Sequence, residues 1–300
     1  MERHEHSHPG QGPRLMAAIV LNGLITVLEI AGGIFSNSLA LLSDAVHNLS
    51  DTMALILAWV ASKIGSRKPD QKRTFGYKRF EILSAFINAS ILTAISIYLI
   101  YEAIQRFLHP EPVKSNLMLV VASIGLLANL ASMLFLHRDA KSSLNVKAAY
   151  LHLLGDTLSS VAVVAGAVLL TFAQILWIDP LLTMIISIVI MVQAYGILRE
   201  SVEILMQSTP NDLNLSEIKA HLEKHPLIKN IHHVHCWQLQ DSDILFEAHV
   251  ETRKDLLLSE SCQLMGEIER QLKENYHISH TTLQIEFEGC DNHDMIRQAR

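Results

Sequence analysis

Two stretches of the sequence repeat a histidine and an aspartate at one spacing within apolar surroundings. The first pair is His47 and Asp51, and the second is His152 and Asp156. Four residues advance a helix by about 400°, so both members of a pair project from one face, one turn apart. Two such helices facing each other would offer two imidazoles and two carboxylates. That is a tetrahedral nitrogen and oxygen set that zinc accepts.

A polar residue in an apolar helix can also serve only to bridge two helices through a hydrogen bond. The duplicated spacing favours the metal site, because ionisable groups at mid-membrane cost roughly 2.5–3.5 kcal/mol each on insertion scales. Four of them cost on the order of 10 kcal/mol on the same scale. A bound divalent cation, or a water-filled cavity leading to one, would offset that cost.

The composition places these motifs in a membrane protein. The 300 residues are 50% hydrophobic and 18% charged, with a mean hydropathy of +0.26, which does not fit a soluble chain. A net charge of −6 without basic blocks favours neither a nucleic-acid binder nor an acidic disordered chain. All three cysteines lie at or beyond Cys236 and indicate reduced thiols in a cytoplasmic domain.

Six apolar runs, each approaching the ~20 residues needed to cross a bilayer, precede Pro210. We therefore predict an α-helical membrane protein with six transmembrane helices. The first run ends without a small-residue cleavage site and five more follow, so we interpret it as a retained helix. The predicted spans are 15–35, 40–62, 82–105, 117–137, 147–173 and 178–206.

The distribution of lysine and arginine predicts the orientation of these helices. The first-to-second and fifth-to-sixth connections carry none, whereas the second-to-third segment is basic and should be cytoplasmic. The fourth-to-fifth loop is basic too, so six spans return both termini to the cytoplasm, as expected for a multi-pass protein of the inner membrane. The basic residues are Lys63, Arg67, Lys68, Lys72, Arg73, Lys78 and Arg79 in the first loop, and Arg138, Lys141 and Lys147 in the second.

After Pro210 the pattern becomes that of a small cytoplasmic α+β domain. The order αββαβ is predicted by helical spacing over 214–225 and 256–275 and by alternation over 231–239, 243–252 and 281–288. Asp241 and Ser242 make a hairpin turn between the first two strands. The expected parts are a His-containing tail at 1–14, a transport domain at 15–208, a regulatory and dimerisation domain at 209–290, and a tail at 291–300.

Together these features resemble the cation diffusion facilitator family over nearly the whole chain. The resemblance rests on the paired His-x-x-x-Asp motifs, the segment Ser38–Asp44, the sequence Thr74-Phe75-Gly76-Tyr77 and the metallochaperone-like αββαβ tail. It points to the bacterial zinc-exporter branch, because only residues 137–146 replace the long His-rich loop of eukaryotic vesicular members. It implies a homodimeric antiporter, not an enzyme, in which His47, Asp51, His152 and Asp156 of each protomer carry zinc outward and protons inward.

Proton coupling also follows from the residue types. Imidazole has an unperturbed pKa near 6.5, so a histidine ligand must be neutral to bind metal and can take a proton when the metal leaves. Competition of this kind, with access from one side at a time, is sufficient for antiport. The sequence contains no Gly-x-x-x-x-Gly-Lys-Ser/Thr loop, and no organic cofactor is expected.

Two other functional classes stay open. A membrane metal sensor could bind zinc and signal through the tail without transport. An intramembrane metalloenzyme is disfavoured, because the His-Glu-x-x-His signature is missing and four protein ligands leave zinc no open position for catalysis.

Other polar residues in the apolar runs have weaker interpretations. Asp44 lies near the face of His47, and we favour a cap or an interhelical hydrogen bond over direct metal binding. Asn22, Glu29 and Asn129 either line a cavity or connect helices, and they stay unassigned.

The cation diffusion facilitator family, which this chain resembles, often binds a second metal in the first basic loop. Arg73 and Tyr77 stand at the positions that histidines would need, so we predict that this loop lacks a metal site. Its cations are then expected to contact anionic lipid head groups of the membrane.

The predicted tail domain has its own ligand set. Alternation along 231–237 predicts that His233, His235 and Trp237 share one face and that His232 and Cys236 share the other. On the next two strands His249 should lie beside Glu247 and Glu251, and Glu286 beside Gln284 and Glu288. The resemblance to the family assigns one regulatory zinc ion to His232, His249 and Glu286.

Two further groups are uncertain ligands. Cys262 is a possible extra ligand as a thiolate, whereas Gln284 is a poor one. The N-terminal His4, His6 and His8 could collect metal or act as a non-specific chelator, and they are left unassigned.

Overall fold

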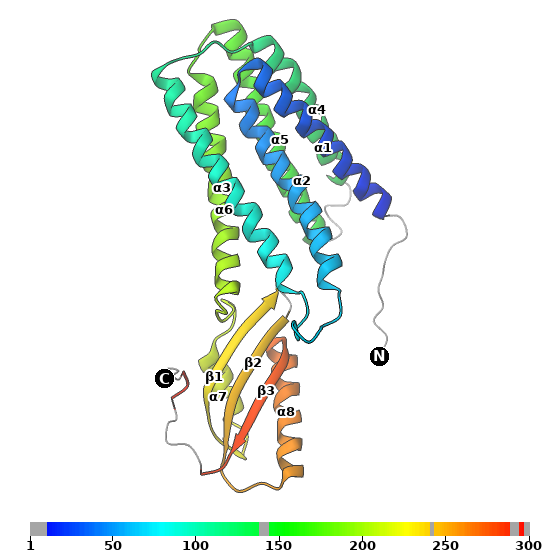
Figure 1. The fold of residues 1–300 in the computed structure, drawn as a ribbon, viewed down its shortest axis with the longest axis vertical. Helices are drawn as coiled ribbons and strands as arrows, with labels where there is room; N and C mark the ends of the chain where they lie inside the picture. Colours follow the sequence, from blue (N-terminus) through cyan, green and yellow to red (C-terminus); the bar gives the residue numbers. More distant parts are fainter. Residues whose placement is uncertain (1–10, 138–143, 241–242, 289–293, 297–300) are drawn as a thin grey trace. The chain divides into compact units, whose positions relative to one another are not determined.

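The computed structural model describes residues 11–137, 144–240, 243–288 and 294–296 (Figure 1). Only the backbone is described for helix residues 11–21, 58, 62, 135–137, 144–149, 151 and 152. The chain forms two compact units. One combines 1–60 with 85–198, and the other combines 61–84 with 199–300.

Six long helices occupy the described residues before Pro210 (Figure 1). Each one contains most of a predicted apolar run. They are α1 Gln11–Ser36, α2 Leu39–Gly65, α3 Arg79–Leu108, α4 Ser115–His137, α5 Leu144–Ala173 and α6 Ile178–Leu205.

Four of these helices are long and apolar enough in their described parts to cross a membrane. They comprise Arg79–Leu108, Ser115–Leu134, Leu153–Ala173 and Ile178–Leu205. The described apolar part of α1, Asn22–Ser36, is shorter. The remaining helix, α2, carries Asp44, His47, Asn48 and Asp51 within its apolar sequence.

Small residues allow α4 to approach α1 closely and α5 to approach α6. A Cβ at Gly166 of α5 would lie 2.3 Å from Leu182 of α6, and one at Gly125 of α4 would lie 2.0 Å from the Glu29 carboxylate of α1. Such contacts are typical of helix packing in lipid. Large apolar side chains remain exposed on the outer faces, for example Leu127, Phe172 and Val192, as expected where lipid is the neighbour.

The described part of the C-terminal domain has the predicted element order αββαβ. Strand β1 pairs antiparallel with β2, which pairs parallel with β3, and the crossover between β2 and β3 contains α8. The elements are α7 Leu215–Leu222, β1 Ile228–Gln240, β2 Asp243–Thr252, α8 Leu258–Tyr276 and β3 Ile278–Glu286.

The two helices cover one face of this sheet and form its core. Side chains of α7 and α8, such as Ile218 and Leu264, pack with Ile231, Phe246 and Val250 of the strands. The carboxamide of Asn214 accepts hydrogen bonds from the first backbone N–H groups of α7 and so caps that helix.

The boundaries of two strands, β1 and β3, differ from the predicted ones. Strand β1 begins three residues early, because Ile228 already pairs with Thr252. Strand β3 also begins early, since α8 ends at Tyr276, the capping residue His277 is in the left-handed conformation, and Ile278 pairs at once with Ile244. The predicted turn at Asp241 and Ser242 lies outside the described residues.

A bulge in β1 overturns the predicted alternation of its faces. His233 has a φ of +50°, and the register shifts between the pairs His232 with His249 and His235 with Glu247. One extra residue in the strand moves every later side chain to the opposite face. His232 therefore shares its face with His235, not with Cys236, which lies in the core.

The described part of the terminal tail lies against this bulge. The backbone N–H of His233 donates to the carbonyl of Asp294, and that of Val234 donates to the carbonyl of Met295. The Met295 side chain packs against the core of the domain. The tail thus bonds to β1 at the point where the strand has lost its regular ladder.

Candidate metal centres

One cluster of a histidine and two carboxylates lies between helices α2 and α5. The Nε2 atom of His47 is 2.9 Å from Oδ1 of Asp156 and 3.9 Å from Oδ2 of Asp51. Potential ligand atoms of the three residues all lie within 4.8 Å of one another. Asp156 is buried and the other two are partly buried. His152 lies in α5, one turn before Asp156, but its side chain is outside the described part of the structure.

A second contact fixes the register of the two helices that carry this cluster. Asp44 of α2 accepts hydrogen bonds from Ser159 at 2.6 Å and from Ser160 at 3.1 Å, both on α5. Asp44 lies about one turn before His47, and these serines lie about one turn after Asp156. The two helices therefore run antiparallel here, and Asp44 forms the predicted interhelical hydrogen bonds.

The unassigned polar residues also connect helices. Asn22 donates to Thr52 at 2.9 Å, and Asn129 donates to Ser160 at 3.0 Å. Glu29 is buried in α1, where it accepts a hydrogen bond of 2.8 Å from Asn48 of α2. These contacts join α1 to α2 and α4 to α5 around the cluster.

The sequence analysis missed one buried acid that orients α2. Asp179 at the start of α6 accepts hydrogen bonds from the Ser38 hydroxyl at 2.5 Å and from the backbone N–H groups of Leu39 and Ala40. It thereby caps the helix that carries His47. The only signal in the sequence is an acid at the edge of an apolar run.

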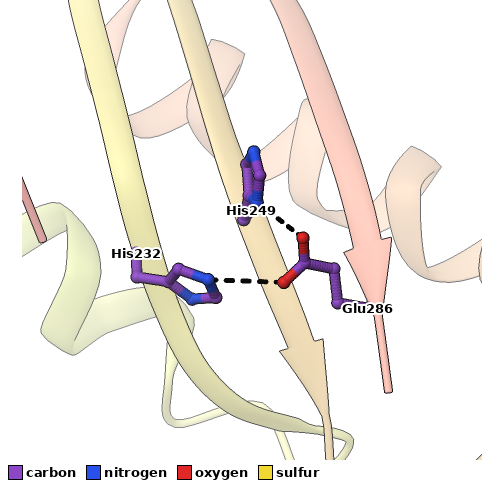
Figure 2. Close-up of side chains that lie close together, drawn as sticks. All are labelled: His232, His249 and Glu286. Carbon is purple, nitrogen blue, oxygen red and sulfur yellow. Dashed lines mark ion pairs between the residues drawn. The ribbon is translucent and has the colours of Figure 1, made fainter. Parts of the chain in front are cut away.

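A second cluster lies on the face of the C-terminal sheet opposite to α7 and α8. Figure 2 shows the Glu286 carboxylate of β3 between the imidazoles of His232 on β1 and His249 on β2. The Glu286 oxygens lie 3.3 Å from Nε2 of His232 and 2.6 Å from Nδ1 of His249. Potential ligand atoms of the three predicted residues lie within 4.8 Å of one another.

Neighbouring polar groups hold this trio in place. The amide of Gln284 donates to Glu286 at 2.8 Å, so this poor ligand has an orienting role. The bulged His233 lies 3.1 Å from the second nitrogen of His249, a contact that the predicted alternation could not show.

Neither described cysteine joins the trio. Cys262 is exposed on α8, which covers the opposite face of the sheet. Cys236 lies in the core, where burial and the nearby Asp212 raise the pKa of its thiol to about 12. Since the thiolate is the form that binds metal, Cys236 is a poor ligand at neutral pH.

The basic loop between α2 and α3 is held together by its own side chains. Asp70 accepts hydrogen bonds from the backbone N–H groups of Arg73 and Lys72 and from the Tyr77 hydroxyl. These bonds lower the pKa of the Asp70 carboxyl below its ordinary value. The Arg73 guanidinium lies 4.8 Å from the centre of the Tyr77 ring. Arg73 and Tyr77, which occupy the positions where a metal site would need histidines, thus contact each other.

Comparison with known proteins agrees with both parts of this architecture. Residues 15–206 match the cation efflux transmembrane domain, and residues 210–288 match the cytoplasmic domain of cation efflux proteins. The chain belongs to the cation efflux family. This confirms the resemblance to the cation diffusion facilitators and the cytoplasmic assignment of the C-terminal domain.

Curated relatives of this cation efflux protein match it over almost its full length. The metal cation efflux system protein CzcD of Cupriavidus metallidurans is 38% identical over 97% of this chain and 92% of its own length. The cadmium, cobalt and zinc/H(+)-K(+) antiporter of Bacillus subtilis is 38% identical, with 97% and 94% covered. The zinc transporter ZitB of Escherichia coli is 35% identical, with 97% and 95% covered.

Proposed function

We propose that this protein exports zinc from the cytoplasm in exchange for protons, using His47, Asp51, His152 and Asp156 as the transport site. The observation that carries the proposal is the contact between α2 and α5, which places one imidazole and two carboxylates within 4.8 Å inside a membrane domain. The names of the relatives, a zinc transporter and a proton-coupled antiporter, support the same cargo and coupling.

His152 completes the site by the register of the two helices. Asp44 contacts Ser159 and Ser160, and His47 contacts Asp156, so positions advance along α2 as they recede along α5. Continuing that antiparallel register by one turn pairs Asp51 with residue 152. The fourth ligand is then an imidazole, and the set has the two nitrogens and two oxygens that suit tetrahedral zinc.

The coupling mechanism depends on one shared hydrogen bond. The imidazole of His47 and the carboxylate of Asp156 are 2.9 Å apart, which is hydrogen-bonding distance, so a proton lies between them. Zinc needs the same nitrogen and oxygen with that proton removed. When the imidazole is protonated, zinc binding releases the extra proton of the pair, and protonation of the imidazole from the other side releases zinc.

We further propose the membrane arrangement in which this exchange works. All six helices α1–α6 span the inner membrane, with both termini in the cytoplasm, as the basic loops predict. Helix α2 is long enough to span, and its polar residues are those of the proposed site. The transport domain covers 15–208 and the regulatory domain 209–290, followed by the tail.

The second domain is proposed to dimerise and to regulate. Its match to a cytoplasmic domain named for dimer formation supports a homodimer. His232, His249 and Glu286 offer two nitrogens and one carboxylate on three adjacent strands, a donor set that fits zinc and leaves a fourth position. Zinc held there would tie the strands together, but the site has no route across lipid.

Zinc flux through purified protein in sealed vesicles tests this function. We expect the wild type to move zinc, with His47→Ala inactive and His109→Ala, a change at an exposed histidine outside the site, fully active. A sensor would bind zinc without transporting it, and a metalloenzyme would convert a substrate without transporting zinc. Zinc binding without flux in the wild type would contradict the proposal.

A further inference from the structure

A cavity of about 760 Å³ lies within the second unit of the chain. It is formed by the ends of α2 and α6, by the loop before α3 together with the first turn of that helix, and by strand β1. One part of its lining is apolar and aromatic and includes Phe75, Trp237 and Leu239. The other part carries five cations, Arg67, Lys72, Arg73, Lys78 and Arg79.

The positive charge of this cavity is only partly neutralised. None of its described lining residues is acidic. Lys78 is paired with Asp243 at 2.7 Å, and Arg73 lies 4.0 Å from Asp70. The carboxylate of Asp70, however, already accepts hydrogen bonds from the loop itself. Five cations thus face two carboxylates.

One cation of the cavity, Arg79, has a buried nitrogen that is available to a ligand. The Nε atom of Arg79 is buried and has no hydrogen-bond partner among the described residues. A buried guanidinium nitrogen without a partner costs free energy unless a ligand binds it. Arginine binds phosphate in particular, because its planar fork can donate two parallel hydrogen bonds.

The position of the cavity indicates which kind of phosphate compound could reach it. Helices α3 and α6 are apolar enough to span a membrane, and α6 leads directly into the cytoplasmic domain. The end of α6 and the start of α3 that line the cavity therefore lie at the cytoplasmic membrane surface. Aromatic side chains such as Trp237 commonly lie at the level of lipid head groups.

We propose that this cavity binds the phosphate head group of an anionic phospholipid from the cytoplasmic leaflet. Arg79 and its neighbouring cations hold the phosphate, while Trp237 and Leu239 contact the apolar part of the lipid. A soluble phosphate would use the cations alone and leave the apolar wall exposed. The inference does not depend on the transport chemistry proposed above.

Native mass spectrometry of the delipidated full-length protein, titrated with phosphatidylglycerol, tests this site. We expect the double variant Lys72→Gln, Arg79→Gln to bind phosphatidylglycerol about 25-fold more weakly, or about fivefold for each cation near the surface. Lys72→Gln alone changes an exposed side chain and should weaken phosphatidylglycerol binding about fivefold. Phosphatidylcholine with the same acyl chains should bind weakly to all forms.

The matched control removes two exposed cations outside the cavity through Lys224→Gln and Lys273→Gln. Phosphatidylglycerol binding should not change in this variant. An equal loss in the control would mean general charge attraction and would overturn the site. Binding of inorganic phosphate at least as tight as that of phosphatidylglycerol would overturn the lipid as its ligand.

Fluorescence of Trp237 gives a second and independent readout. In a variant with Trp59→Phe and Trp177→Phe, the remaining tryptophan lies in the cavity. Phosphatidylglycerol with brominated acyl chains should quench it, and brominated phosphatidylcholine should quench it much less. Equal quenching by the two lipids would contradict a site that selects the anionic head group.

Discussion

The helix trio of His47, Asp51 and Asp156 and the strand trio of His232, His249 and Glu286 use the same side-chain chemistry on different backbones. In the helix trio, two members lie one turn apart on α2 and only Asp156 comes from another element. In the strand trio, each member comes from a separate strand. Local geometry assembles most of the first cluster, whereas strand register assembles all of the second.

This difference predicts how each cluster responds to change. The helix trio is surrounded by interhelical hydrogen bonds that Asp44 and Glu29 accept and that Asn129 donates, so its backbone is fixed independently of metal. The strand trio lies beside a bulge at His233. Metal should therefore change the order of the strand trio more than that of the helix trio.

The largest effect should come from removing a ligand of the helix trio. We expect His47→Ala or Asp156→Ala to lower zinc flux more than about 100-fold. Mutation of a residue that only hydrogen-bonds to a metal ligand already lowers metal affinity or activity about 10–100-fold. Flux in proteoliposomes is the measurement, with membrane insertion and dimer mass checked in parallel. Near-normal transport by Asp156→Ala would remove this residue from the site.

A matching loss is expected from His152→Ala, because the helix register makes this residue the fourth ligand. The comparison variant is Ser159→Ala, which removes one hydrogen bond to Asp44 but no proposed ligand. We expect a much smaller change in flux for Ser159→Ala. If His152→Ala behaved like Ser159→Ala, the site would have three protein ligands and not four.

Lower pH on the cytoplasmic side should weaken zinc binding at the helix trio. A protonated imidazole cannot ligate, so the apparent zinc affinity is retained at pH values where the histidines are neutral and falls as pH drops and they become protonated. The expected slope is about tenfold per pH unit for each proton that zinc displaces. Zinc titrations at several pH values measure it, and a flat profile would argue against shared ligands.

An intermediate effect is expected from the strand trio. The double variant His249→Ala, Glu286→Ala should need several-fold more zinc for half-maximal flux and keep substantial flux at high zinc, because a regulatory site acts only through the balance of states. Flux measured across zinc concentrations gives the curve. Total loss of flux in a folded dimer, or an unchanged curve, would each show the regulatory assignment to be wrong.

A smaller effect is expected for the metal selectivity of the transport site. Two imidazoles with two carboxylates suit zinc, whereas the larger and softer cadmium gains most from thiolates. We expect zinc to outcompete cadmium in flux at equal concentration, and His47→Asp to relax this preference. The name of the Bacillus subtilis relative includes cadmium, so the competition is a sharp test. Faster cadmium flux in the wild type would contradict the nitrogen and oxygen site.

The smallest effect concerns thiol reactivity near the strand trio. Because burial raises the pKa of Cys236 to about 12, this thiol should stay protonated at pH 8 and react far more slowly than the exposed Cys262. Alkylation followed by peptide mass spectrometry measures the two rates. Rapid modification of Cys236 in the folded protein would show that the core opens near the bulge.

The helix trio could be predicted from the sequence because its spacing is visible in the chain. A separation of four positions from His47 to Asp51 places both on one helix face, and the same spacing recurs at His152 and Asp156. The cap that Asp179 gives to α2 was not predictable in this way. It joins residues about 140 positions apart, and no local pattern records such a contact.

The strand trio could be predicted only in part. The family resemblance selected its three members, but period-two alternation placed His232 on the face of Cys236. The bulge at His233 breaks that period, and nothing in the neighbouring sequence marks it, since histidine is not the glycine that usually signals positive φ. The Asp70 loop likewise shows its hydrogen bonds only once folded.

Simultaneous measurement of zinc and proton flux in proteoliposomes tests the central claim most directly. With zinc and pH indicators inside the vesicles, an imposed proton gradient should drive zinc in the opposite direction in the wild type. The variant Asp156→Asn should lose both fluxes together, because zinc and protons use the same atoms. Zinc movement without proton movement in the wild type, or coupled flux that persists in Asp156→Asn, would contradict the account.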